Sequence, residues 1–276
     1  DLGSQRIGVV MGSSTSGIAA AEEAITAHLR SGELPPSFDY RQLELGGAAA
    51  FLAAYVGIEG PAYTLSTACS SSARALESAR SLLALDICDA VVAGGADSLC
   101  RLTANGFAAL QAISDAPSNP FSCNRKGMTL GEGATLFLLT KRPDGVQLLG
   151  AGSSSEGYHM SAPEPEGTGA EVAMRVALSD AGLTPDAVAY VNLHGTGTPL
   201  NDAMEAKALS RVFGRPVACS STKPLVGHTL GASGAIEAGF CWLMLTRRAA
   251  GEIQLPPHRW DSLLDPNLPP LHLVAV

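Results

Sequence analysis

Three short motifs carry residues that could do chemistry, and the first of them contains a cysteine. Cys69 follows the apolar stretch Tyr63–Thr67 and is followed by three serines, Ser70–Ser72. Unpaired N–H groups at a helix N-terminus favour the thiolate and can stabilise an oxyanion formed on an acylated sulfur. The alternative is a structural cysteine, because free cysteines are among the most buried residue types. The motif is therefore typical of either a nucleophile or a core residue.

The other two motifs contain histidines in glycine-rich surroundings. His194 follows the apolar stretch Val188–Leu193 and precedes a Gly-Thr-Gly-Thr run, and His228 follows Lys223 by five residues in a second glycine-rich loop. Ligands collect at strand ends in α/β sheets, and glycines allow the backbone to approach them closely. A lone histidine is more often structural than catalytic, so both interpretations stay open. Zinc ligands usually cluster at short spacings, and these three residues do not, so we expect no catalytic metal. A cysteine-protease arrangement leaves the second histidine loop unexplained.

Alternating strands and helices must position these residues. Short apolar runs predict strands, and longer stretches between them predict helices. The predicted strands are Ile7–Met11, Tyr63–Thr67, Ala90–Ala93, Ala134–Thr140, Gln147–Ala151, Val188–Leu193, Val217–Ser220 and Leu271–Val276. The predicted helices are Ile18–Arg30, Gly46–Val56, Ser70–Leu85, Gly169–Ala181, Ala203–Phe213 and Ala232–Arg247. This alternation predicts an α/β protein with buried sheets.

The composition excludes several classes of protein. The 276 residues carry 18 Lys and Arg against 26 Asp and Glu, a net charge of −8, which argues against a nucleic-acid-binding protein. Hydrophobic residues make up 46% of the chain, enough for a large core, and no apolar stretch reaches the length of a membrane helix. The six cysteines form no C-x-x-C pair and are sparse for a disulfide framework. We therefore expect a reducing, cytoplasmic compartment.

Taken together and in order, the motifs resemble those of the β-ketoacyl-acyl-carrier-protein synthases, the elongating condensing enzymes of the thiolase superfamily. The matching segments are Thr67–Ser71, His194–Thr198 and Gly227–Gly234, supported by Val92–Asp97, Gly131–Ala134 and Ser220–Lys223. The resemblance covers the chain from about Arg6 to about Pro257. It implies a thiolase-like layered α/β/α/β/α fold with two similar halves, residues 1–145 with the cysteine and 146–276 with the two histidine loops, forming one folding unit.

The resemblance also implies an activity, that of an acyltransferase. Cys69 would accept an acyl chain from a carrier protein, and the carbanion formed by decarboxylation of a malonyl-carrier protein would attack that thioester, in fatty-acid or polyketide and polyene synthesis. His194 and His228 would hydrogen-bond the enolate oxygen. Lys223 would orient the catalytic groups. We expect no cofactor.

Further residues follow from the same resemblance. Asn192, Glu205 and Glu237 match a structural polar network that, in similar enzymes, is able to include a monovalent cation. A solvated helix face is the alternative for Glu205. The partners would be an acidic acyl carrier protein and a second subunit in a homodimer, or in a heterodimer with a related subunit. Arg125 and Lys126 are candidates for binding the carrier protein, with scattered solvated charges as the alternative.

The sequence departs from the family at both ends. Related enzymes begin with a further strand–loop–helix segment and end with a glycine-rich gating loop, and neither matches within residues 1–276. We therefore expect a chain that is incomplete at both ends and inactive by itself. Two other functions stay open: a non-catalytic chain-length subunit, which usually lacks the active-site cysteine, and a thiolase-type acyl-CoA acyltransferase, which would need a second catalytic cysteine.

Overall fold

The chain divides into two compact units, each with its own sheet. The computed structural model describes residues 3–249 and 252–274. Unit 1 comprises Asp1–Ala109, Leu130–Gly145 and Thr229–Gly239, and unit 2 comprises Leu110–Thr129, Val146–His228 and Phe240–Val276. The cysteine motif therefore belongs to unit 1, and both histidine motifs place their histidines in unit 2.

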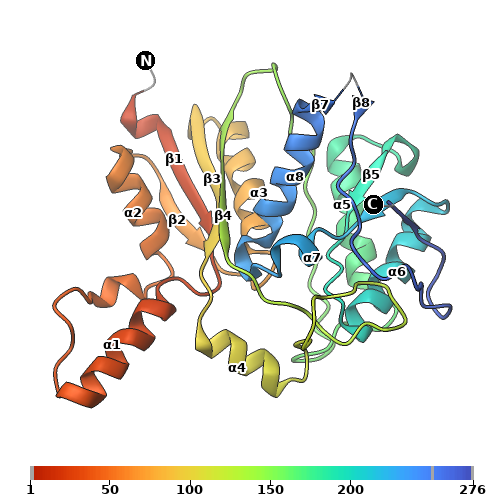
Figure 1. The fold of residues 1–276 in the computed structure, drawn as a ribbon. Helices are drawn as coiled ribbons and strands as arrows, with labels where there is room; N and C mark the ends of the chain where they lie inside the picture. The colour runs from red at the N-terminus through yellow and green to blue at the C-terminus, as the bar shows by residue number, and fades with distance from the viewer. Residues whose placement is uncertain (1–2, 250–251, 275–276) are drawn as a thin grey trace. The chain divides into compact units, whose positions relative to one another are not determined.

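The sheet of unit 1 has four strands in the order β2-β1-β3-β4 (Figure 1). These are β1 (Ile7–Gly12), β2 (Ala62–Leu65), β3 (Ala90–Asp97) and β4 (Gly133–Thr140). β1 pairs in parallel with β2 and β3, whereas β4 runs antiparallel to β3 with Val92 opposite Leu138. All four had been predicted from apolar runs, and β3 extends beyond its predicted end to reach Asp97.

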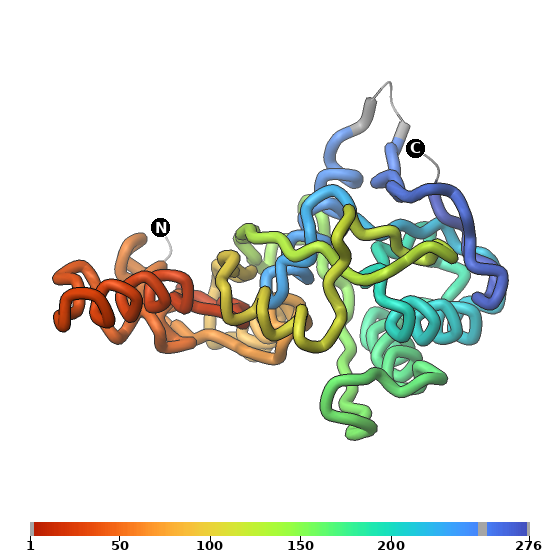
Figure 2. Tube along the Cα trace, turned by 60° about the horizontal axis from the view of Figure 1, so that its bottom comes forward, coloured from red at the N-terminus to blue at the C-terminus, as the bar shows by residue number. Residues whose placement is uncertain are grey.

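Successive residues of β1 point to opposite faces of this sheet, as a strand requires. Val10 packs in a core under α3 (Ser71–Ala84), and Val9 and Met11 pack in a second core under α2 (Gly47–Val56). The helix α1 (Ile18–Ser31) covers neither face and lies beyond the sheet, near α4 (Arg101–Ala109), in both Figure 1 and Figure 2. α4 was not predicted from the sequence.

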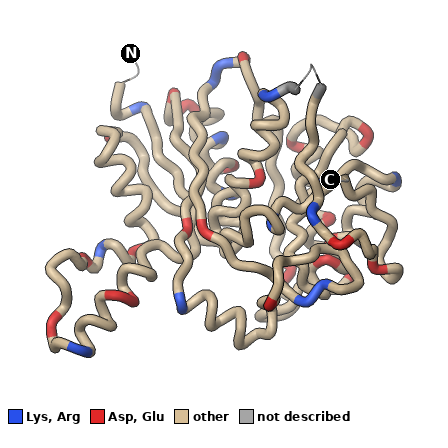
Figure 3. The backbone as a smooth tube through the Cα atoms, viewed as in Figure 1, with Lys and Arg blue, Asp and Glu red and all other residues tan. Residues whose placement is uncertain are grey.

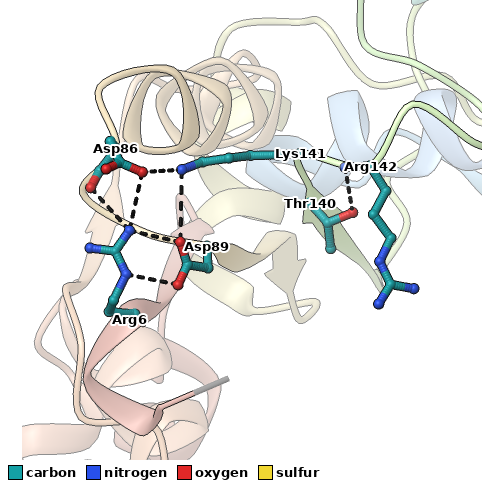
Figure 4. Close-up of polar contacts among 6 residues, drawn as sticks. All are labelled: Arg6, Asp86, Asp89, Thr140, Lys141 and Arg142. Atoms are coloured by element: carbon teal, nitrogen blue, oxygen red, sulfur yellow. Dashed lines mark hydrogen bonds and ion pairs between the residues drawn. The ribbon is translucent and has the colours of Figure 1, made fainter. Parts of the chain in front are cut away.

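A cluster of exposed ion pairs connects three segments of unit 1 (Figure 4). The guanidinium of Arg6, just before β1, donates to both carboxylate oxygens of Asp89 at 2.7 Å and to Asp86 at 3.2 Å. Lys141, just after β4, also pairs with Asp86 and lies 3.7 Å from Asp89. Hydrogen bonds from Lys141 and from Arg6 lower the pKa of Asp86 and of Asp89, respectively. The cluster joins the start of β1, the α3–β3 connection and the end of β4.

Unit 2 has a parallel three-stranded sheet in the order β5-β6-β9. Its strands are β5 (Tyr190–Asn192), β6 (Ala218–Ser220) and β9 (His272–Leu273), and its helices are α5 (Thr168–Ala181), α6 (Pro199–Phe213) and the short α7 (Lys223–Val226). α8 (Ser233–Thr246) begins in unit 1, and a hairpin of β7 (Arg248–Ala249) and β8 (Glu252–Ile253) follows it. Phe121, Leu193 and Leu209 belong to the core of unit 2.

The predicted strand Gln147–Ala151 is wrong, because this segment has no strand pairing. It lies instead against α5: a Cβ on Gly150 would come within 2.5 Å of the backbone nitrogen of Ala181, and Ala151 donates its N–H to Asp180 at 2.9 Å. Because Gly150 has no side chain, the segment can lie close to α5, and this contact takes the place of strand pairing. The predicted strand Leu271–Val276 forms over His272–Leu273, and its last two residues lie outside the described residues.

Charged residues are sparse along the backbone, and α2 has none, as its tan colour in Figure 3 shows. Among the described residues, no helix combines the length and the apolar character needed to cross a membrane.

Candidate active site

His194 stands on a loop that the next helix holds through a carboxylate. The loop leaves β5 after the fully buried Leu193 and ends where Pro199 starts α6. Glu205, on the second turn of α6, accepts the backbone N–H of His194 at 2.6 Å and that of Gly195 at 2.8 Å. Burial raises the pKa of Glu205 to about 7, although its bond from the Gly195 N–H opposes the rise. The carboxyl group therefore positions the main chain of the loop and is not solvated.

A second carboxylate, Asp202, holds the far end of the same loop. It is fully buried and accepts the N–H of Gly197 at 3.2 Å and that of Phe121 at 2.8 Å. Burial raises its pKa to about 6. Asp202 precedes Glu205 by three residues, so both carboxyl groups lie on one face of α6. Sequence reasoning missed Asp202; an acidic residue in the first turn of a helix was the available signal.

Lys223 and His228 lie on the segment after β6. Lys223 starts α7 and is 2% exposed, and its Nζ lies 3.3 Å from Nδ1 of His194. His228 is 1% exposed and donates its backbone N–H to the Thr129 carbonyl at 2.7 Å. The imidazole rings of His194 and His228 meet edge to face, with centroids 5.2 Å apart. Unit 2 therefore brings together three of the predicted site residues.

Both imidazoles are neutral in this setting. Burial, and secondarily the positive charge of Lys223, lowers the pKa of His228 to about 3, and the same two causes hold the pKa of His194 well below its usual range. Because the ammonium group of Lys223 only donates, Nδ1 of His194 accepts and the ring proton lies on Nε2. A neutral N–H next to a buried cation is suited to stabilising a developing oxyanion.

Cys69 lies in unit 1, in the tight turn between β2 and α3. The preceding residue, Ala68, has φ of +56°, a left-handed conformation that a residue with a Cβ rarely adopts. Hydroxyl groups of two serines are among the groups that hold this turn. The Ser71 hydroxyl donates to the Ala68 carbonyl at 2.5 Å and accepts the Thr67 N–H at 2.9 Å, and the Ser14 hydroxyl donates to the same carbonyl at 3.0 Å. The thiol is therefore presented by a strained turn at the start of a helix.

Asp97, at the end of β3, organises the loop that contains Ser14. It is 6% exposed, and its carboxylate accepts the Ser14 N–H at 2.9 Å, the Thr15 N–H at 2.8 Å and the Ser13 hydroxyl at 2.7 Å. It also accepts the N–H of Ala232 at 3.2 Å. The sequence had marked Asp97 only as part of a supporting motif. The structure connects it, through Ser14, to the Cys69 turn.

The same loop borders a cavity of about 1160 Å³ in unit 1. Small and apolar side chains from α2, β3 and β4 form part of its wall, among them Ala50, Phe51, Ala96 and Ala134. Charged residues also line it, including Arg41 and Glu132.

The remaining predicted residues are placed differently from one another. The two side-chain polar atoms of Asn192, at the end of β5, are buried and have no hydrogen-bond partner in the described residues, so Asn192 does not bond to Glu205. Glu237 lies on α8 within unit 1, whereas Asn192 and Glu205 belong to unit 2. Arg125 and Lys126 are the candidates for binding a carrier protein. The side chain of Arg125 is 8% exposed and pairs with Asp265 at 2.7 Å, whereas Lys126 is exposed.

Comparisons with known proteins place this geometry among condensing enzymes. Residues 1–144 match the family model described as "Beta-ketoacyl synthase, N-terminal domain", and residues 146–253 match "Beta-ketoacyl synthase, C-terminal domain". The chain is 35% identical to 3-oxoacyl-[acyl-carrier-protein] synthase 2 of Vibrio cholerae, over 84% of the chain and 61% of that relative. It is 33% identical to nodulation protein E of Rhizobium meliloti, over 96% of the chain and 69% of that relative. The chain thus spans less than two thirds of the Vibrio cholerae relative.

Solved structures agree. A chain in the complex "Ketosynthase (ApeO) in Complex with its Chain Length Factor (ApeC) from Xenorhabdus doucetiae" is similar with a TM-score of 0.93 and 47% identity, over 99% of this chain and 68% of that one. A beta-ketoacyl synthase from Burkholderia phymatum STM815 has a TM-score of 0.87 and 31% identity, over 100% of this chain and 70% of that one. These likenesses confirm the predicted thiolase-like α/β fold class.

Proposed function

Because the chain belongs to the beta-ketoacyl synthase family, we propose that the protein containing it catalyses a decarboxylative Claisen condensation. The Cys69 thiolate attacks the carbonyl of an acyl-carrier-protein thioester, the carrier thiolate leaves, and the acyl chain stays on sulfur. A malonyl-carrier protein then loses carbon dioxide and leaves an enolate. The enolate carbon attacks the acyl-Cys69 carbonyl and expels the Cys69 thiolate. The product is a β-ketoacyl chain, two carbons longer, on the carrier protein.

The observation that carries this proposal is the neutral histidine pair beside Lys223. Decarboxylation moves negative charge onto the thioester oxygen, and neutral N–H groups on His194 and His228 can donate to it without first losing a proton. With Nδ1 facing Lys223, His194 has its N–H on the other side of the ring. Lys223 adds positive charge that favours the enolate, and the contact of its Nζ with the His194 ring holds that charge in place. Glu205 and Asp202 fix the loop and do not enter the reaction.

The strained turn at Cys69 supports the acyl-transfer half of the reaction. A thiol at the start of α3 benefits from the positive end of the helix dipole. The cavity beside the Asp97 loop offers unit 1 a partly apolar space for an acyl chain. The free cysteines among the described residues agree with a reaction in the cytoplasm.

A carrier protein and a second synthase-type subunit complete the proposal. α2 exposes an apolar face that includes the stacked rings of Phe51 and Tyr55, 69% and 78% exposed, and β2 is an edge strand of its sheet. Large exposed apolar patches and unpaired edges mark interaction surfaces. We propose this surface as the subunit interface. The similarity to a ketosynthase in complex with a chain length factor makes a heterodimer the second candidate assembly.

The test uses the intact protein with acyl- and malonyl-carrier proteins, followed by mass spectrometry. Acylation should add mass to the peptide that contains Cys69 and disappear in Cys69→Ala, whereas Cys123→Ala, which removes an exposed thiol of unit 2, should be acylated normally. His228→Ala should lose malonyl decarboxylation while it still accepts an acyl chain. Acylation that persists in Cys69→Ala, or decarboxylation that persists in His228→Ala, would contradict the proposal.

A further inference from the structure

A third histidine in unit 2, His258, is fully buried and takes no part in the reaction proposed above. It follows β8 in a proline-rich segment. Its ring packs near the rings of Phe121 and Trp260, with centroids 6.1 and 5.4 Å away. Complete burial of a polar ring is costly unless both nitrogens find partners.

Both ring nitrogens of His258 have partners, and these partners fix its tautomer. Nδ1 accepts the backbone N–H of Ser221 at 3.0 Å, and Nε2 lies 3.1 Å from the carbonyl oxygen of Pro120. Because the backbone N–H can only donate and the carbonyl can only accept, Nε2 carries the proton and Nδ1 does not. Burial also lowers the pKa of His258 to about 4, although its bond to Pro120 opposes this. The ring is therefore a neutral, fixed bridge between two segments.

Ser221 connects this bridge to both groups that orient His194. Its hydroxyl donates to the Gly195 carbonyl at 2.7 Å and accepts the backbone N–H of Lys223 at 3.3 Å. The contact with Gly195 is close: a Cβ there would lie 2.6 Å from the Ser221 Cβ, and its φ is +36°. Gly195 is the neighbour of His194 in the chain, and Lys223 contacts Nδ1 of that histidine. A shift of Ser221 would therefore move both supports of the His194 ring.

We propose that His258 is a positioning residue of the condensing reaction: by accepting the Ser221 N–H, it fixes the serine that aligns Gly195 and Lys223 around the His194 ring. This inference rests on the proposed function, since alignment of His194 matters only if its N–H stabilises the enolate. The hydrogen bond from Nε2 of His258 to the Pro120 carbonyl does not involve Ser221 and holds another loop. The two ring nitrogens of His258 thus have different tasks, which two substitutions can separate.

The test compares His258→Asn with His258→Gln in the intact protein. The Asn amide places its oxygen close to where Nδ1 was, so it can still accept the Ser221 N–H but cannot reach Pro120. The Gln amide reaches the Nε2 position and can donate to Pro120 but leaves the Ser221 N–H without its acceptor. We expect His258→Asn to keep malonyl decarboxylation within a few-fold of the wild type and His258→Gln to lose at least tenfold in kcat, with KM unchanged. If the two variants lose kcat equally, and in proportion to their loss of stability in urea, the proposal is overturned.

Ser221→Ala provides a second variant that keeps the N–H bonded to His258 and removes only the hydroxyl. It should reduce kcat to a similar extent as His258→Gln, and wild-type activity would overturn the proposal. The ¹⁵N signals of the His194 ring give a readout that does not depend on turnover. They should show protonated Nε2 in the wild type and in His258→Asn, and a changed Nδ1 signal in His258→Gln; an unchanged signal there would also overturn it. If the wild type does not decarboxylate malonyl-carrier protein, the proposed function fails, whereas the ring signals still test the link from His258 to His194.

Discussion

The neutral state of His228 should be visible in the pH dependence of folding. Burial, aided by the charge of Lys223, lowers the pKa of His228 to about 3 in the folded protein, whereas an unfolded histidine titrates at about 6.5. Between these values the unfolded chain binds one proton that the folded chain does not. The free energy of unfolding is therefore highest above the unfolded pKa and falls as the pH falls, by about 1.4 kcal/mol per pH unit.

The substitution His228→Gln removes this titration and keeps a polar side chain. Lowering the pH from about 7 to about 5 should cost the wild type about 2 kcal/mol through His228, and should cost the variant nothing through this position. The stability advantage of the wild type over the variant should therefore shrink by about 2 kcal/mol across that interval. Urea unfolding followed by the fluorescence of Trp242 and Trp260 measures both proteins at each pH.

The comparison isolates His228 because other titrating groups are present in both proteins. Glu205 acts in the opposite sense: its pKa is raised to about 7, so its contribution to stability grows as the pH falls through that value. A stability difference that stays constant between these two pH values would refute the claim that His228 is buried and neutral.

Three further substitutions test other parts of the structure. Glu205→Gln leaves one good acceptor for two backbone N–H groups of the His194 loop, so decarboxylation by the intact protein should fall at least tenfold while circular dichroism stays unchanged. Asp97→Asn removes the charge that gathers the loop behind Cys69. Urea unfolding should show a loss of about 3 kcal/mol, and alkylation of Cys69 should become slower. Arg6→Gln breaks the cluster of Figure 4 and should lower Tm at low ionic strength, with a smaller effect at about 1 M salt.

For each of these three substitutions, one result would contradict the expected outcome. Wild-type decarboxylation in Glu205→Gln would mean that the loop does not depend on the carboxylate. An unchanged rate of Cys69 alkylation in Asp97→Asn would separate the Asp97 loop from the cysteine turn. A Tm difference for Arg6→Gln that is equal at low and high salt would show that the ion pairs contribute nothing by charge.

The sequence was most informative where function depends on short contiguous motifs. The motifs around Cys69, His194 and Lys223 contain both the reactive group and the small residues beside it, so the type of chemistry could be inferred from local patterns. The alternation of apolar runs likewise predicted every strand of the unit 1 sheet. These features depend on neighbours in the chain, which a sequence displays directly.

Features that depend on distant partners could not be read in the same way. Arg125 was a candidate for binding a carrier protein, and its ion pair with Asp265, 140 positions away, could not be foreseen. Gln147–Ala151 had the composition of a strand, yet its glycine, Gly150, lets it pack on α5 instead of pairing. His258 lies outside every motif, and the role proposed for it depends on its bond to Ser221, 37 positions away. Tertiary contacts decided each of these cases.

The arrangement in unit 2 separates the positive charge that the proposed reaction needs from the groups that would titrate. A protonated imidazole would be a stronger donor to an enolate, but a buried imidazolium is costly and its proton would be lost near neutral pH. Here the positive charge resides on Lys223, which contacts the back of the His194 ring, while both rings remain neutral donors. The carboxyl groups of Asp202 and Glu205 accept backbone N–H groups of the loops, so they orient the main chain of the site. In the proposed reaction, the positive charge of Lys223 would favour the oxyanion, while the two neutral rings would donate their N–H groups to it.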